Sequence, residues 1–458
     1  MKKFQWILYS VCSIALLLFV SCNKLLDTGV SDNRLDNKKI FTNDSLSREA
    51  VVGICVSMMS AQRNIFNGGT TLLASLSADE LTDNKGDGQE YAFYRNSLEP
   101  DIRILRDSLW LPAYNYIYQC NNVIERLYEY DGVSQLLKNQ LIGEVKFLRA
   151  FCYYYLVNLF GDMPLVLVTD YKQSAIIPRT PVSKIYQQII EDLQQADSLL
   201  PNNISNAFPT KLASEAMLSR VYLHQQKWEE AEAYATLVIQ SGKFSLENDL
   251  DKVFVSTSRE TIFQLETTIN GINTVEGRLF IPFSATATPS FSMDSTLVDA
   301  FQANDSRKAH WTKTINVYGI SYTIPYKYKL NSDKSSVREY NVVLRLAEQY
   351  LIRAEARTMQ LKLQEAVEDL NIIRNRAALP LLPPSLSLDE CGNAIEQERR
   401  IELFTEWGHR WFDLKRTSRA NAILGARKGS DWQSTDQLYP VPTIEMTRNP
   451  SLTQNSGY

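Results

Sequence analysis

Histidine is scarce in this chain, with only three among 458 residues, and they lie far apart at His224, His310 and His409. Gly-rich phosphate loops, nucleophile elbows and metal-binding helix motifs are absent as well. The sequence therefore gives no reason to expect a catalytic triad, a metal site or a bound cofactor.

An excess of basic charge is also missing. The chain has 48 Lys and Arg against 52 Asp and Glu, a formal net charge of −4. Nucleic-acid binding favours clustered positive charge, so we expect no nucleic-acid partner.

Cysteine is sparse, and its spacing matches neither a metal motif nor a small disulfide framework. Four cysteines follow Cys22 in the sequence: Cys55, Cys120, Cys152 and Cys391. Cys120 and Cys152 lie in apolar segments with helical periodicity, which favours buried free thiols. An exported protein could form disulfides, and the sequence leaves their pairing open.

A long apolar run occurs at the N-terminus, where Lys2 and Lys3 precede roughly fifteen mostly apolar residues, too few for a membrane-spanning helix. Ser21-Cys22 follows this run. A small residue before cysteine is typical of lipoprotein processing, which would leave Cys22 acylated at the mature N-terminus. We expect a signal peptide over 1–21 and a polar tether over 22–40. The alternative is an ordinary secretory signal with an incidental cysteine.

Helical periodicity dominates the rest of the chain. Helices are expected at about 44–62, 109–130, 135–160, 181–200, 211–225, 228–241, 339–360, 363–377 and 389–418. Two helix pairs carry small residues twelve positions apart, Ser219 with Ala231 and Ala354 with Ala366, as tetratricopeptide-like repeats do. A third pair, with Ala150 and Ala196, is split by residues 161–180. The predicted fold is mainly α, a tetratricopeptide-like helical-repeat scaffold in one domain over 41–458.

Irregular insertions interrupt this scaffold at about 64–107, 244–340 and 425–458. Short strands are expected within the second one, at 261–265, 279–283 and 322–326. Long irregular segments in compact domains are often functional, so these insertions are where ligand specificity is expected.

Several blocks of sequence resemble the SusD/RagB family of outer-membrane lipoproteins of Bacteroidetes, in the family's order and across essentially the whole mature chain. The blocks are 22–27, 143–151, 160–165, 344–356, 373–377, 400–403, 408–416 and 438–458. Ala378 and Ser456 stand where the family more often has glycine and proline.

The resemblance implies a cell-surface lipoprotein that is held in the outer membrane by its lipid. It would bind oligosaccharides and deliver them to a SusC-like TonB-dependent transporter. Two alternatives stay open: a peptide-binding uptake lipoprotein of the RagB type, and a tetratricopeptide-type protein-interaction scaffold without a small ligand.

Aromatic residues in the insertions are the candidate ligand contacts, because sugar rings stack on aromatic faces while polar neighbours bind the hydroxyls. We expect Tyr94 and Asn96 in the first insertion, and Arg307, Trp311, Tyr318 and Tyr322 in the second. The alternative for each is that it packs the insertion against the helices.

Acidic residues suggest two further sites, and neither is well supported. Glu398, Glu402 and Glu406 share one helical face, whereas a glycosidase needs carboxylates on either side of a sugar bond, roughly 5–9.5 Å apart. Nearby arginines favour a salt-bridged structural face, and we expect no catalytic residue and no enzyme activity. Asp79, Asp83 and Asp87 do not fit an EF-hand, which leaves only a non-standard calcium site open.

Overall fold

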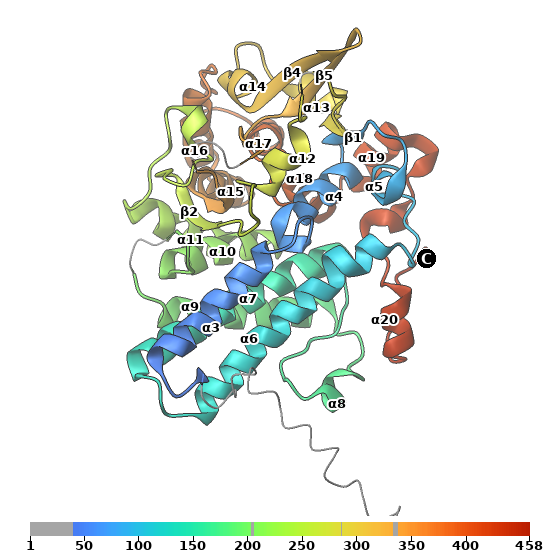
Figure 1. Ribbon diagram of the computed structural model, residues 1–458. Helices are drawn as coiled ribbons and strands as arrows, with labels where there is room; N and C mark the ends of the chain where they lie inside the picture. Colours follow the sequence, from blue (N-terminus) through green and yellow to red (C-terminus); the bar gives the residue numbers. More distant parts are fainter. Residues whose placement is uncertain (1–39, 203–205, 285, 333–337) are drawn as a thin grey trace, which may run out of the picture.

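A computed structural model describes residues 40–202, 206–284, 286–332 and 338–458. The predicted signal peptide, Cys22 and nearly all of the predicted tether lie outside these described residues. Helices make up most of the fold (Figure 1). In chain order they are α3 (Asp44–Met59), α4 (Thr70–Ser77), α5 (Gly88–Tyr94), α6 (Leu111–Glu129), α7 (Gln135–Phe160), α8 (Tyr171–Ser174), α9 (Val182–Leu199), α10 (Lys211–His224), α11 (Trp228–Gln240), α12 (Val275–Phe280), α13 (Ser295–Ala300), α14 (Ser306–Trp311), α15 (Leu346–Met359), α16 (Leu363–Arg376), α17 (Leu388–Glu402), α18 (His409–Arg416), α19 (Ala420–Lys428) and α20 (Thr443–Arg448).

Three small two-stranded antiparallel sheets and several short helical turns complete the fold. The pairs are β1 (Leu81–Asp83) with β3 (Phe291–Met293), β2 (Thr261–Leu265) with β6 (Asn341–Arg345), and β4 (Thr312–Val317) with β5 (Ile320–Pro325). The turns are η1 (Ile65–Gly69), η2 (Leu105–Trp110), η3 (Leu250–Lys252), η4 (Gly429–Asp431) and η5 (Ser434–Gln437). Within the described ranges, no helix is both long and apolar enough to cross a membrane.

Helix α7 lies at the centre of the helical scaffold. From Leu141 onward nearly all of its side chains are buried, including those of Glu144, Lys146 and Arg149. A helix buried on all sides must pair its charges inside the protein. Arg149 does so by donating from Nε and Nη2 to the two carboxylate oxygens of Asp192 on α9, at 2.8 and 2.7 Å. This buried pair fixes α9 against α7.

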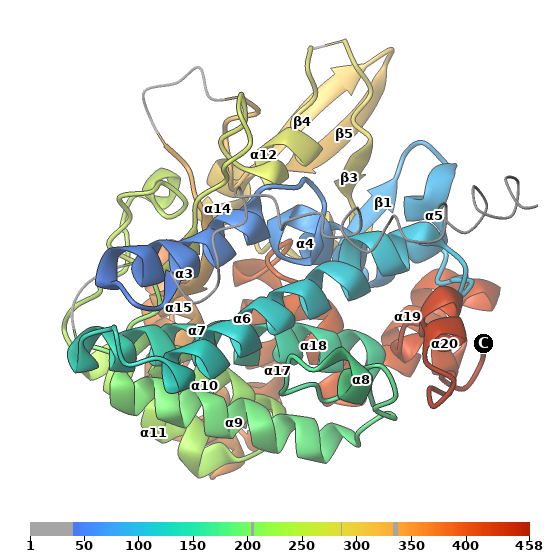
Figure 2. The ribbon, with the colours of Figure 1, turned by 60° about the horizontal axis from the view of Figure 1, so that its bottom comes forward.

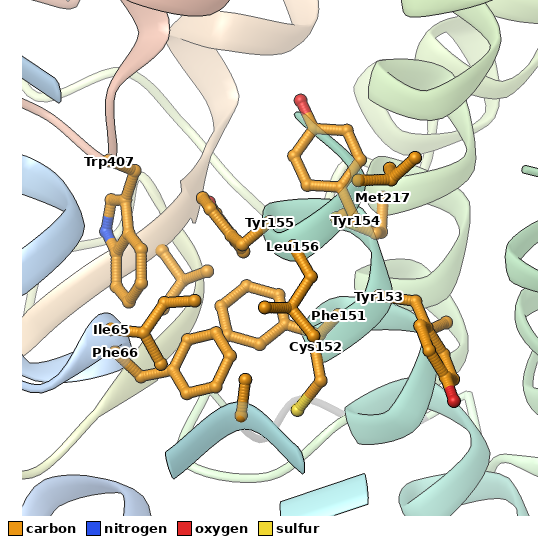
Figure 3. Packing of buried hydrophobic residues seen from close by; sticks show 14 of the residues in the cluster. Ile65, Phe66, Phe151, Cys152, Tyr153, Tyr154, Tyr155, Leu156, Met217 and Trp407 are labelled. Carbon is orange, nitrogen blue, oxygen red and sulfur yellow. The ribbon is translucent and has the colours of Figure 1, made fainter. Parts of the chain in front are cut away.

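The main core is rich in aromatic side chains that come from distant parts of the sequence (Figure 3). Phe66 of η1 lies 5.0 Å from Phe151 of α7, measured between ring centroids. Phe151 lies 4.9 Å from Tyr155, and Tyr155 lies 5.4 Å from Trp407. Each such ring pair adds about 0.5–1.5 kcal/mol beyond its burial. The aromatic core thus joins the first insertion and the C-terminal third to the helical scaffold.

Small residues stand where paired helices approach each other, as the repeat pattern predicts. Helices α7 and α9, α10 and α11, and α15 and α16 pack as pairs, and α11 also packs on α15. The small residues at these contacts are all fully buried: Ala150, Ala196, Ser219, Ala231, Ala354 and Ala366. The tetratricopeptide-like, mainly α fold predicted from the sequence is therefore confirmed.

Three predicted elements differ from the structure. Residues 341–345 form strand β6 instead of the start of a helix, because their backbone pairs with β2 while their side chains are buried. Residues 279–283 are not a strand, since α12 runs to Phe280. The helix expected over 389–418 breaks between α17 and α18, where Thr405, Trp407 and Gly408 all have positive φ angles. The indole of Trp407 reaches into the core there and donates to the Val342 carbonyl at 2.7 Å.

The four described cysteines are free thiols. Cys120 and Cys152 are buried in the main core, as the sequence predicts, and burial raises the pKa of both well above the usual value. Buried thiols of this kind pack as small apolar residues.

Candidate functional site

Parts of the first and second predicted insertions meet on one side of the molecule, opposite α9, while α20 of the third insertion lies elsewhere (Figures 1 and 2). We call the surface formed by α5, α12, the β1–β3 pair and the β4–β5 hairpin the insertion face. Strands β1 and β3 join the first insertion to the second, with Leu81 opposite Met293 and Asp83 opposite Phe291. Asn84 extends this pairing, since its backbone N–H and its side-chain amide donate to the Ser290 and Pro289 carbonyls, both at 3.0 Å. Segments about two hundred residues apart therefore build one surface.

Two tyrosines and an arginine lie together at the end of α5. Tyr91 and Tyr94 are three residues apart on the helix, so they share one side, with ring centroids 5.9 Å apart. Both are half-buried. The Arg95 guanidinium lies 6.0 Å from the Tyr91 ring centroid and donates to an Asp431 carboxylate oxygen at 2.5 Å. Nε and Nη2 of Arg95 both face the Asp431 carboxylate, and the Arg95 side chain is 44% exposed to solvent.

Lys428 fixes the C-terminal segment beneath these tyrosines. Its Nζ donates to the backbone carbonyls of Leu76 and Tyr94, both at 2.7 Å, and lies 5.3 Å from the Tyr94 ring centroid. Enclosure of this ammonium lowers the pKa of Lys428 to about 7. Helix α5 is thereby held on one side by the C-terminal segment and on the other by the β1–β3 pair.

Asn96, predicted beside Tyr94, is buried at the end of α5 with a φ of 50°. Its side-chain nitrogen donates to the Ser77 carbonyl at 3.3 Å, while its side-chain oxygen has no hydrogen-bond partner within the described ranges. Asn96 therefore ties α5 to the end of α4, and of the two predicted residues Tyr94 offers the larger surface to a ligand.

The β4–β5 hairpin carries Tyr318 and Tyr322. Its two-residue turn, Tyr318-Gly319, has φ angles of 50° and 81°, as tight hairpin turns require. Tyr318 is 91% exposed at the tip, and Tyr322 is half-buried opposite Ile315. Within the described part of the chain, no ring contact joins either residue to Tyr94, so α5 and the hairpin form two separate aromatic groups on the insertion face.

A third aromatic group includes Phe283, which was not predicted from the sequence as a ligand contact. Phe283 is 75% exposed, and the guanidinium carbon of Arg278 lies 3.9 Å from its ring centroid. Near the hairpin, the ammonium groups of Lys313 and Lys329 lie 5.0 and 4.6 Å from the ring centroid of Tyr326. Cations next to exposed or half-exposed rings supply hydrogen-bond donors beside apolar faces.

Trp311 and Arg307 do not contribute to this surface. Trp311 is fully buried at the end of α14, where its Nε1–H donates to the Leu250 carbonyl at 3.0 Å. Arg307 is 1% exposed and donates to Asp305 and Glu402. Both side chains pack the second insertion against α17, which is the alternative that the sequence left open. We leave them out of the candidate site.

The three glutamates on one helical face belong to a buried ion-pair network, as interpreted from the sequence. Glu402 pairs with Arg307, Arg345 and Arg376. Burial alone would raise the pKa of Glu402, but these three guanidinium groups hold it well below the usual value. The network also takes in Glu398, which pairs with Arg374 at 2.6 Å. Carboxylates so enclosed have no room for a sugar bond between them.

Of the aspartates considered for calcium, Asp79 is engaged in ion pairs with two arginines. Asp79 accepts hydrogen bonds from Arg400 and from Nε and Nη2 of Arg410, at 2.7–2.9 Å. Asp83 lies in strand β1. No group of three or more histidine, cysteine or acidic side chains within the described residues is arranged to hold a metal ion.

Two family models match different parts of the chain. The model described as "SusD family" matches residues 289–458, and the one described as "Starch-binding associating with outer membrane" matches residues 35–223. The chain is 28% identical to SusD-like protein P2 of Formosa agariphila, over 98% of this chain and 99% of that protein. It is 22% identical to a SusD-like protein of Bacteroides ovatus, over 88% and 81%.

Solved structures of this family share the fold. A SusD superfamily protein from Bacteroides vulgatus superposes with a TM-score of 0.81 at 21% identity, covering 92% of this chain and 100% of the other. A laminarin-binding SusD-like protein gives 0.76 at 24% identity, over 91% and 100%. Surface glycan-binding protein A from Bacteroides fluxus gives 0.75 at 21%, over 90% and 99%. With both family models and relatives that match over almost its full length, the chain belongs to the SusD-like family.

Proposed function

We propose that this protein binds oligosaccharides at the insertion face and delivers them to a SusC-like TonB-dependent outer-membrane transporter. The observation that carries the proposal is the arrangement of Tyr91, Tyr94 and Arg95 on α5. Two neighbouring rings offer apolar faces for the C–H groups of sugar rings, and a partly exposed guanidinium offers donors for their hydroxyls. Tyr318 and Tyr322 on the hairpin would extend the contact to a longer ligand.

Family membership supports this proposal and its cellular context. One matching family is described by starch binding and association with the outer membrane, and two structural neighbours are named for laminarin and surface-glycan binding. The proposal includes acylation of Cys22 as the membrane anchor, with the insertion face turned to the cell exterior or to the transporter. It also assigns the protein a binding role without catalysis.

Calorimetric titration with laminarihexaose, maltoheptaose and a mixed peptide library tests the proposal. We expect an oligosaccharide to bind and Tyr91→Ala or Tyr94→Ala to weaken binding by about thirtyfold, since loss of a hot-spot aromatic costs about 2 kcal/mol. Tyr128→Ala is the matched control, because Tyr128 is 64% exposed on α6 outside the insertion face. Binding of peptides alone would replace the glycan proposal with the peptide-uptake alternative.

A further inference from the structure

A polar cleft lies between the C-terminal end of α3 and the N-terminal part of α6, which run side by side in Figure 1. Its volume is about 560 Å³. Asn115, Tyr118 and Gln119 of α6 line it, with Gln62 from the loop after α3 and Ser108 from η2. On α6 these residues are spaced i, i+3 and i+4, so one side of a single helix presents an aromatic ring between two amides.

Four polar side chains of this cleft are free to bind a ligand. The side chains of Gln62, Asn115 and Gln119, and the hydroxyl of Tyr118, take part in no hydrogen bond to another described residue. Asn64 in the same cleft shows the contrast. Its amide is fully used, accepting from Phe66 and Asn67 and donating to the Met58 carbonyl. A free amide offers both donors and acceptors, as vicinal sugar hydroxyls require.

Tyr118 supplies the apolar surface of the cleft. The side chain is 53% exposed. It also lines a neighbouring cavity of about 260 Å³, under the segment that links α7 to α9. Tyr118 therefore lies where the two hollows meet and can contact a ligand in either one.

The charge of the cleft selects the class of ligand. Asp107 is the one carboxylate among its lining residues, which include no Lys, Arg or His, and Arg106 already donates to that carboxylate at 2.7 Å. An anionic ligand would find no positive charge among the lining residues, and the one carboxylate available to a cation is already paired with Arg106. Amides, hydroxyls and one exposed ring match a neutral oligosaccharide.

We propose that this cleft is a second carbohydrate-binding site for neutral oligosaccharides, separate from the insertion face. The inference rests on the proposed glycan-binding function and adds a second place on the surface where the glycan binds. The two sites are neighbours: Arg63, which follows Gln62, pairs with Glu90, which precedes Tyr91, at 2.7 Å. A long oligosaccharide could then be held at two points along its length.

The test is calorimetry of the full chain with laminarihexaose, maltoheptaose, xylohexaose and mannohexaose, combined with hydrogen exchange. We expect Tyr118→Ala, and separately Gln119→Ala, to weaken binding of one of these sugars tenfold or more. Tyr128→Ala, ten residues further along the same helix, should have no effect. Peptides covering 57–64 and 107–119 should gain exchange protection when the sugar binds.

The outcomes separate the two proposals. One outcome is that Tyr94→Ala weakens sugar binding while Tyr118→Ala and Gln119→Ala leave it unchanged. This result overturns the second site and keeps the site on the insertion face. The opposite pattern supports the cleft and removes the insertion face. Failure of the chain to bind any of the four sugars overturns both.

Discussion

Arg345 and Glu402 form a buried ion pair, with 2.6 Å between Nη1 and Oε1 and with both side chains at most 2% exposed. The same guanidinium also contacts Glu260 and Glu406. Arg345 precedes α15, and Glu402 ends α17. The pair therefore joins β6, α15 and α17 at the base of the second insertion, and it holds the support of the insertion face in place.

Glu402→Gln should destabilise the protein by about 3–5 kcal/mol, because it leaves three buried guanidinium groups short of a countercharge. Urea unfolding followed by circular dichroism measures the change. Glu368→Gln is the control, since Glu368 is exposed on α16 and should cost less than about 0.5 kcal/mol. Equal stability of the two variants would show that the network contributes little.

Glu276 predicts an unusual dependence of stability on pH. It is buried in α12, with hydrogen bonds from Asn341 and Thr71 and no ion pair within the described chain, and burial raises its pKa to about 7. The folded state therefore binds this proton more tightly than the unfolded state, whose pKa is near 4.5. The resulting stabilisation is complete below pH 4.5 and is lost as the pH rises through 7.

Glu276→Gln removes this titration. The variant should gain about 3 kcal/mol relative to the wild type between pH 4 and pH 8, because its amide stays neutral throughout. Free energies of unfolding at several pH values give the comparison. Parallel curves for the two proteins would mean that Glu276 titrates at its ordinary pKa.

Most helices could be predicted from periodicity because their burial is local and regular. Helix α7 has the predicted bounds, 135–160, since its apolar run ends at Gly161, whose φ is 72°. The break after Glu402 could not be predicted in the same way. It depends on Gly408, where an added Cβ would lie 2.9 Å from the Cβ of Ala74, and that contact is invisible in the sequence.

The candidate site was predicted only in part. Aromatic density points to the two insertions that form the insertion face, and Tyr94 and Tyr318 do reach the surface. Density alone cannot tell which rings face solvent, so it does not distinguish the buried Trp311 from the exposed Tyr318. Arg95 with Asp431 could not be foreseen, because the two residues meet only once the C-terminal segment folds back onto α5.

Cys22→Ala tests the proposed anchor. The variant should fold normally but move from the membrane fraction to the soluble fraction, and it should take up no labelled fatty acid. Acyl chains contribute about 0.8 kcal/mol per buried CH₂, so their loss removes the main attachment. Wild-type protein that stays on the membrane without incorporating any lipid label would contradict the proposal.

Trp311→Ala separates a core role from a ligand-binding role. The ring is fully buried, lies 5.7 Å from the Phe254 ring centroid, and has the Lys327 ammonium 4.9 Å from its own centroid. Removing it should cost about 3–5 kcal/mol, from lost burial and the cavity left behind.

Tyr318→Ala is the surface counterpart, because that ring is almost fully exposed and its loss should change stability by less than about 0.5 kcal/mol. We measure the melting temperature and the sugar affinity of both variants, and we expect the two variants to change them in opposite ways. Trp311→Ala should lower the melting temperature and keep the affinity of the folded protein, while Tyr318→Ala should keep the melting temperature and weaken binding. A Trp311→Ala protein with wild-type melting and reduced affinity would return Trp311 to the ligand site, because only an accessible ring can lose binding energy without losing stability.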